Sequence, residues 1–178
     1  MKRSKNYPIN MSEIIQTRDN RRAFIDALCE LAETDKDILF IIPDVGFNYA
    51  DKFQKLYPER FFNFGVTEAS SAIIAAALAL SGKKPYFYSM INFVTFRIHE
   101  MIRNAICLHK ANVKILGVKG SEKYKFLGFS HNLLREDEEV DFLQKLPGMT
   151  TYIPHTPEET REIILKTYAD PAPAYIRL

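Results

Sequence analysis

Short continuous apolar runs alternate with longer helical patterns along the whole chain, and this alternation restricts the fold more than any other feature. The runs at 38–42 and 113–118 are apolar at nearly every position and lack the polar alternation of a half-exposed strand. Similar but weaker patterns predict strands at 61–64, 85–89, 150–153 and 174–178. Strands covered on both faces pair in parallel and need helical crossovers. The pattern therefore predicts one α/β domain with a doubly wound, mostly parallel sheet.

Helical patterns fill the intervals between these strands. They are expected at 18–34, 67–81, 93–109, 138–146 and 156–168. Thr17 is the expected N-cap of the first helix, and Thr156, with Glu159 at capping-box distance, that of the last. The polar stretch at 119–137 interrupts the rhythm, and loops of that length in compact domains are usually functional or mobile.

The composition fits one domain and gives no sign of nucleic acid or membrane partners. Of 178 residues 47% are hydrophobic, and the formal net charge is only +2. The longest apolar run, 72–80, falls far short of the roughly 20 residues that span a bilayer. Cys29 and Cys107 lie far apart and indicate structural thiols in a reducing cytoplasm. We expect an N-terminal arm at 1–16 and a single domain at 17–178.

Glu68 opens the helix predicted at 67–81, whose remaining body is almost wholly apolar. A carboxylate in the first turn of a helix is ordinarily explained by the helix dipole, a gain of about 0.3–1 kcal/mol. A helix that is apolar on every side must however be covered by its own sheet and by a partner, as at a subunit interface. A glutamate leading such a helix is partly desolvated and suited to sharing a proton. The local pattern leaves both interpretations open.

The segment after the third predicted strand carries aromatic and charged residues at helical spacing. Phe93 and Phe96 are three residues apart, a spacing that occurs more often in cores than in ligand platforms. Arg97 and Glu100 have the same spacing and indicate a surface ion pair or an anchor to a neighbouring element. His131 lies in the polar loop, where a histidine is usually solvated. No metal cluster, nucleophile elbow or glycine-rich phosphate loop occurs in the sequence, which excludes those classes of site.

Several segments, taken in order, resemble the pyrimidine-binding domain of transketolases. They are PDVGF at 43–47, YPERFFNFGVTE at 57–68, SGK at 81–83, the block at 88–104, SH at 130–131, LPGM at 146–149 and YIRL at 175–178. The resemblance runs from about Asp44 to the last residue, and it implies the pyrimidine-type thiamine diphosphate-binding fold.

The resemblance implies roles for particular residues around the aminopyrimidine ring of thiamine diphosphate. Glu68 takes the place of the glutamate that hydrogen-bonds this ring and shares a proton with a ring nitrogen, and is thus the expected central catalytic residue. Phe93 matches the aromatic residue that stacks on the pyrimidine, and Phe96 is expected to line the same pocket. Met90 stands where some transketolases carry another aromatic residue.

Asp44 and the polar loop at 119–137 bear on the substrate, and this loop both matches the family pattern and departs from it. Asp44 and His131 fall where family residues approach the cofactor or the substrate, so Asp44 is an expected cofactor contact and His131 a second catalytic residue. The family usually carries Asp-Gly-x-Thr-His, whereas residues 127–131 read LGFSH. Leu127 therefore replaces the aspartate that contacts substrate hydroxyl groups. This departure favours an unusual ketose or 2-oxo acid, as in the synthesis of a modified sugar, over a pentose phosphate.

A full transketolase also has a diphosphate-binding domain, to which no segment of this chain is similar. The resemblance implies thiamine diphosphate with Mg²⁺ or Ca²⁺ bound by a partner subunit, in a heterodimer or heterotetramer, and no metal site in this chain. The helix at 67–81 is the expected interface. The implied activity is transfer of a ketol or acyl unit through a carbanion on thiamine diphosphate. Two alternatives stay open: the β-type subunit of a 2-oxo acid dehydrogenase or decarboxylase, and a non-catalytic binding module.

Overall fold

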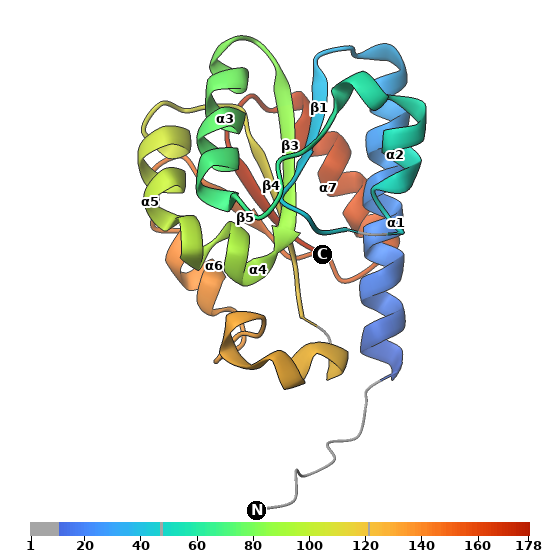
Figure 1. Ribbon diagram of the computed structural model, residues 1–178, viewed down its shortest axis with the longest axis vertical. Coiled ribbons are helices and arrows are strands. Elements are labelled where there is room, and N and C mark those ends of the chain that lie inside the picture. The colour runs from blue at the N-terminus through green and yellow to red at the C-terminus, as the bar shows by residue number, and fades with distance from the viewer. Residues whose placement is uncertain (1–10, 47, 121) are drawn as a thin grey trace, which may run out of the picture.

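A six-stranded sheet lies between two layers of helices in the computed structural model, which describes residues 11–46, 48–120 and 122–178 (Figure 1). The strands are β1 (Ile38–Ile42), β2 (Phe61–Asn63), β3 (Lys84–Met90), β4 (Lys114–Val118), β5 (Thr150–Tyr152) and β6 (Ala174–Arg177). Their order is β2-β1-β3-β4-β6-β5, and each neighbouring pair is parallel. The predicted α/β class and parallel sheet are confirmed.

The helices vary in length and type. The α-helices are α1 (Met11–Thr34), α2 (Asp51–Leu56), α3 (Glu68–Leu80), α4 (Ile91–Val94), α5 (His99–Met101), α6 (Glu138–Leu143) and α7 (Pro157–Ala169). Short 3-10 helices are η1 (Pro58–Arg60), η2 (Phe96–Ile98) and η4 (Glu122–Ser130), and η3 (Ile102–Cys107) is a π-helix. Within the described residues, no helix is both long and apolar enough to cross a membrane.

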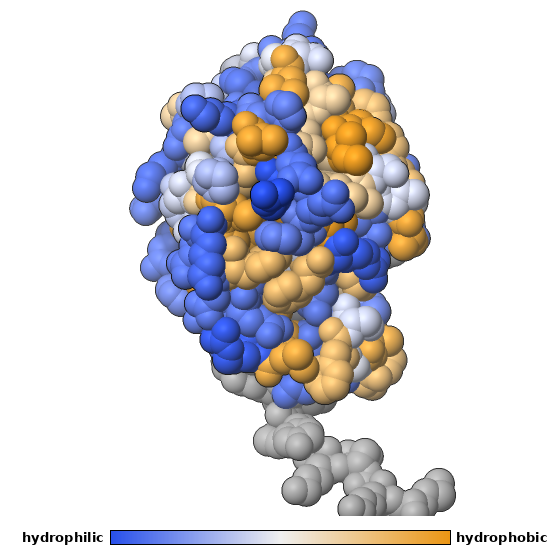
Figure 2. All heavy atoms as spheres, turned by 90° about the vertical axis from the view of Figure 1, so that its left-hand side faces the viewer, coloured by the Kyte–Doolittle hydropathy of each residue, from blue (hydrophilic) through white to orange (hydrophobic). Residues whose placement is uncertain are grey.

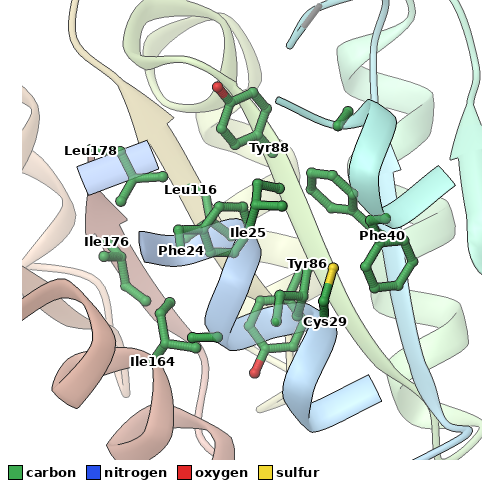
Figure 3. Close-up of a cluster of buried hydrophobic side chains, with 14 of the residues drawn as sticks. Phe24, Ile25, Cys29, Phe40, Tyr86, Tyr88, Leu116, Ile164, Ile176 and Leu178 are labelled. Carbon is green, nitrogen blue, oxygen red and sulfur yellow. The ribbon is translucent and has the colours of Figure 1, made fainter. Parts of the chain in front are cut away.

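Helices α1, α2 and α7 cover one face of the sheet over a dense aromatic core. Phe24 of α1 meets Phe40 of β1 edge-on at 5.7 Å and stacks on Tyr88 of β3 at 6.0 Å. Figure 3 shows these side chains converging from the helix and the strands, with Ile164 of α7 and Ile176 of β6 beside them. Their burial from water supplies the main stabilisation of this layer.

Helices α3, α5 and α6 lie on the opposite side of the sheet (Figure 1). Helix α3 turns three small residues, Ala72, Ala75 and Ala76, towards the core, and each is buried. Small side chains let the helix approach the sheet closely. Ile102 and Ile106 of η3 fill the space beside them. Because each face of the sheet is covered, its central strands read as continuous apolar runs.

Two helical predictions are wrong and one is confirmed. The first helix is already formed at Met11, and Thr17 lies inside it, because threonine lowers helix stability only slightly. The single helix expected at 93–109 is divided into α4, η2, α5 and η3, since Thr95 has non-helical angles of φ −123° and ψ −81°. Thr156 does cap the last helix and accepts a hydrogen bond from the amide of Glu159.

Candidate active site at the carboxyl edge of the sheet

The carboxyl ends of the central strands bring most of the predicted site residues to one edge of the sheet. The connection after β1 leads to β2 on one side, and the connection after β3 leads to β4 on the other, so the topological switch point lies between β1 and β3. Ligands of open parallel sheets bind at such a point. Asp44 follows β1, and its backbone amide donates to the side chain of Asn63 at 3.1 Å, while Met90 ends β3.

A tight turn between β2 and α3 places Glu68. Gly65 adopts a φ of +69°, and its amide donates to Asn63 Oδ1 at 3.0 Å. The hydroxyl of Thr67 donates to the backbone carbonyl of Phe64 at 2.9 Å and does not cap the helix. Glu68 thus enters the first turn of α3 with only 4% of its surface exposed. A buried carboxylate requires a partner, which comes from another element.

Arg97 is that partner. Its Nη1 donates to Glu68 Oε1 at 2.6 Å, and its guanidinium carbon lies 3.8 Å from the centre of the Phe93 ring. The break at Thr95 separates Arg97 from the helix that carries Phe93. Of the two alternatives predicted for this arginine, the anchor to a neighbouring element is the one observed. The partner could not be predicted, because it lies 29 residues away in the sequence.

His131 reaches the same cluster from the loop after β4. Its ring meets Phe93 edge-on, with 4.9 Å between the ring centres. Asn92 of α4 holds this loop, since its side-chain amide donates to the backbone carbonyls of Phe129 at 2.9 Å and Asn132 at 3.2 Å. The structure therefore brings Glu68, Phe93 and His131 together, with Arg97 between the first two. Asn92 was not predicted, because a lone asparagine carries no signal of this role.

The other predicted contacts lie around this cluster rather than within it. Phe96 opens η2 after the break and packs on Phe142 of α6, with ring centres 5.6 Å apart. Its side chain remains 38% exposed, so it can still border a pocket. The carboxylate of Asp44 faces the amide of Asn63 at 3.5 Å, which places Asp44 at the β1–β2 side of the edge.

A second, buried ion cluster fixes the far end of the His131 loop. Arg177 at the end of β6 donates through Nε to Glu139 Oε1 at 2.7 Å and through Nη1 to Glu136 Oε1 at 2.9 Å. Tyr175 donates to the same Glu139 oxygen at 3.2 Å. Burial lowers the pKa of Arg177, but the charge and hydrogen bond of Glu139, together with Tyr175 and Asp137, raise it overall. The sequence did hold a sign of this cluster, because an arginine within the apolar strand at the end of the chain indicates a buried acidic partner.

The chemistry available at this edge is that of a carboxylate and an aromatic ring that together hold one planar cation. Such a pair suits a flat nitrogen heterocycle that donates a hydrogen bond to the carboxylate and stacks on the ring. Within the described part of the chain, no group of three or more histidine, cysteine, aspartate or glutamate side chains could hold a metal ion.

Solved structures of other proteins share this arrangement of helices and strands. The fold is that of the pyrimidine-type thiamine diphosphate-binding domain, as shown by a structure titled "Split gene transketolase, inactive beta4 tetramer". It has a TM-score of 0.76 and 34% sequence identity, over 89% of this chain and 50% of that chain. The transketolase of Campylobacter jejuni has a TM-score of 0.76 and 18% identity over 89% of this chain and 25% of its own, a likeness of fold alone.

Sequence comparison identifies the family. Residues 16–178 match the family described as "Transketolase, pyrimidine binding domain", and the chain belongs to this family. It is 34% identical, over 89% of its length, to an apulose-4-phosphate transketolase subunit of Phocaeicola vulgatus, and 29% identical, also over 89%, to a 6-deoxy-6-sulfo-D-fructose transketolase subunit of a Clostridium species. The chain spans 50% and 48% of these two relatives, about half of each.

Proposed function

We propose that the chain is the pyrimidine-binding part of a split, transketolase-like enzyme that uses thiamine diphosphate to transfer a ketol or acyl unit. One observation carries this proposal: the buried carboxylate of Glu68 and the ring of Phe93 are joined by a single planar cation. A carboxylate and an aromatic face are what an aminopyrimidine ring requires of its site. When bound, thiamine diphosphate supplies a carbon nucleophile that attacks carbonyl substrates.

Each residue of the cluster takes a defined role. Glu68, buried in the first turn of α3, would hold the aminopyrimidine through its carboxylate and would share a proton with a ring nitrogen. Phe93 orients the ring by stacking, and Phe96 and Met90 border the pocket. His131, which lies in edge contact with Phe93, would exchange a hydrogen bond with a substrate oxygen.

The substrate side of the site favours an unusual sugar. Leu127 has an exposed apolar side chain where the family has a substrate-binding aspartate, so it removes an acceptor for hydroxyl groups. Asp44 remains as a carboxylate at the β1–β2 side of the same edge. Two relatives are named for apulose-4-phosphate and 6-deoxy-6-sulfo-D-fructose. A modified or branched ketose is therefore the proposed substrate class, with a 2-oxo acid as the other.

A partner subunit is proposed to cover the outer side of α3 and to bind the diphosphate and its Mg²⁺ or Ca²⁺. Ile73 and Ile74 are 51% and 37% exposed, and Leu80, two turns after Ile73 on the same side of the helix, is 59% exposed. Figure 2 shows this side of the molecule, where hydrophobic patches alternate with polar ones. A heterodimer or heterotetramer would bury them. The free, buried Cys29 and Cys107 support a reducing, cytoplasmic setting.

The two alternatives are not favoured. The relatives named above are transketolase subunits, and further relatives are 1-deoxy-D-xylulose-5-phosphate synthases. A non-catalytic module needs neither a buried carboxylate nor an aromatic ring beside it.

Replacement of Glu68 in a two-chain complex tests the proposal. The chain is co-expressed with the diphosphate-binding subunit of a split transketolase from the same genome, and thiamine diphosphate binding and ketol transfer are measured. We expect Glu68→Ala to lower turnover by at least 100-fold, the loss typical of general acid–base residues. Glu158→Ala is the matched control, because Glu158 occupies the first turn of α7, a helix of the same length on the other face. Equal turnover in the two variants would contradict the proposal.

A further inference from the structure

Arg97 makes, within the chain, both of the contacts that the proposed function assigns to a ligand. Its guanidinium donates to the Glu68 carboxylate at 2.6 Å and lies 3.8 Å from the centre of the Phe93 ring. A guanidinium is a planar, delocalised cation that bonds carboxylates and stacks on aromatic faces. An aminopyrimidine ring protonated on nitrogen is planar too, donates an N–H and has a π face. The same oxygen and the same ring therefore suit both groups.

The two cannot be held at once, because the cluster is closed. Glu68 is 4% exposed and Phe93 is 9% exposed, and His131 lies against Phe93 with ring centres 4.9 Å apart. A heterocycle finds no open face on a ring covered in this way. Arg97, by contrast, has 43% of its side chain exposed and belongs to the three-residue helix η2 that follows the break at Thr95. It can turn out into water without opening the core.

We propose that Arg97 is a placeholder: it occupies the aminopyrimidine position in the unloaded chain and leaves when the cofactor binds. This inference rests on the proposed function and adds a residue that sets cofactor affinity. An unpaired carboxylate at the buried position of Glu68 would be strongly unfavourable. Arg97 gives that carboxylate a hydrogen-bonded partner until the ligand replaces it. The apparent affinity is then lower than the intrinsic one by the fraction of chains in which Arg97 has moved out.

Thiamine binding to arginine variants tests the placeholder. Thiamine is titrated into the isolated full chain, because both contact residues belong to this chain, and binding is followed by NMR together with the Nε–H signal of Arg97. We expect Arg97→Ala to bind thiamine roughly tenfold more tightly than the unmodified chain. Arg97→Lys should gain less, since lysine keeps the charge but lacks the planar fork. The matched control is Arg161→Ala, which removes a similarly exposed arginine (44%) from an ion pair with Glu30 and should leave binding unchanged.

The outcomes separate this inference from the function on which it rests. Tighter binding in both Arg97 variants, with a shift of the Arg97 signal on titration of the unmodified chain, supports the placeholder. Equal or weaker binding in Arg97→Ala would overturn it, as would an Arg97→Lys chain that behaves like the unmodified one, since charge repulsion would then explain the alanine result. Binding that persists in Glu68→Gln would overturn the proposed function instead, and absence of binding in every chain would overturn both.

Discussion

Helices α3 and α7 have the same length of 13 residues and lie on opposite faces of the sheet, yet their outer surfaces differ completely. The exposed positions of α7 are mostly charged, and Arg161 forms an ion pair with Glu30 of α1. The exposed positions of α3 include Ile73, Ile74 and Leu80 and no charged side chain. The outer surface of α7 is therefore typical of a helix that faces solvent, whereas that of α3 is typical of a helix covered by another element.

The first turns of the two helices differ in the same sense. In α7 the carboxylate of Glu159 is exposed and accepts from the backbone amide of His155 at 2.7 Å, so it serves the helix end itself. In α3 the carboxylate of Glu68 is buried and bonded to Arg97 instead. A glutamate in the first turn is thus used for capping in one helix and is held in a site in the other. Burial, rather than sequence position, separates these uses.

A charge placed on the outer side of each helix should give the largest difference. Ile73→Asp is expected to weaken association with the diphosphate-binding subunit by at least 100-fold, because a carboxylate buried in an apolar interface costs several kcal/mol. Leu165→Asp is the matched change on α7, where Leu165 is 40% exposed, and it should leave association unchanged. Sedimentation of the mixed subunits measures both.

The isolated chain provides the control for folding. Because Ile73 is 51% exposed, its replacement should change the free energy of unfolding by no more than about 1 kcal/mol. A folded Ile73→Asp chain that still assembles normally would mean that α3 is not the interface, and the contrast with α7 would lose its functional meaning.

The reactivity of the two cysteine thiols should show that both helix layers exclude solvent from their cores to the same extent. Cys29 of α1 belongs to the core on the face covered by α1 and α7, Cys107 of η3 belongs to the core on the opposite face, and burial raises the pKa of each from 9.0 to about 11. The reactive thiolate is then roughly 100-fold scarcer at pH 8 than in the unfolded chain. Labelling of each thiol should be slower by at least that factor and should rise with pH up to about 11.

Single Cys29→Ser and Cys107→Ser chains, each labelled with a disulfide reagent, assign the rates. Similar labelling rates of the one thiol left in each variant would mean that α3 and α7 differ only in their outer surfaces. If Cys107 alone reacted at the unfolded rate, the α3 layer would be open as well as uncovered.

The sheet and its order of elements were predictable because buried parallel strands leave a strong pattern. The apolar runs at 38–42 and 113–118 are typical of strands covered on both faces. The cap at Thr156 was predictable for a similar reason, since capping is a local interaction. The division of the segment 93–109 was not, because the break at Thr95 depends on packing against other elements.

Three members of the candidate site were predictable, but its contacts and the places of Arg97 and Asn92 in it were not. The resemblance to transketolases pointed to Glu68, Phe93 and His131, and the structure places the three together. The position of Arg97 between Glu68 and Phe93 depends on how α3 and η2 pack, and no short-range pattern reports that. Whether these residues act as proposed stays a prediction for the variants of Glu68 and Arg97.

The smallest expected difference concerns the threonines before the two helices. Thr156 Oγ1 accepts from the amide of Glu159 at 3.1 Å, so Thr156→Ala should lower the free energy of unfolding by about 1 kcal/mol. Thr67 donates to the carbonyl of Phe64 and makes no cap, so Thr67→Ala should cost less than about 0.5 kcal/mol. Urea denaturation of the isolated chain measures both changes.

The comparison of caps also bears on the site. Helix α3 begins without a side-chain cap, so the amides of its first turn and the positive end of its dipole remain directed at the edge where Glu68 lies. A Thr67→Ala cost as large as that of Thr156→Ala would show that Thr67 is a structural anchor, through its bond to Phe64 and its approach to Ser71 at 3.3 Å. The smaller cost would instead indicate that no side chain caps the start of α3. The amides of its first turn would then be available to a ligand.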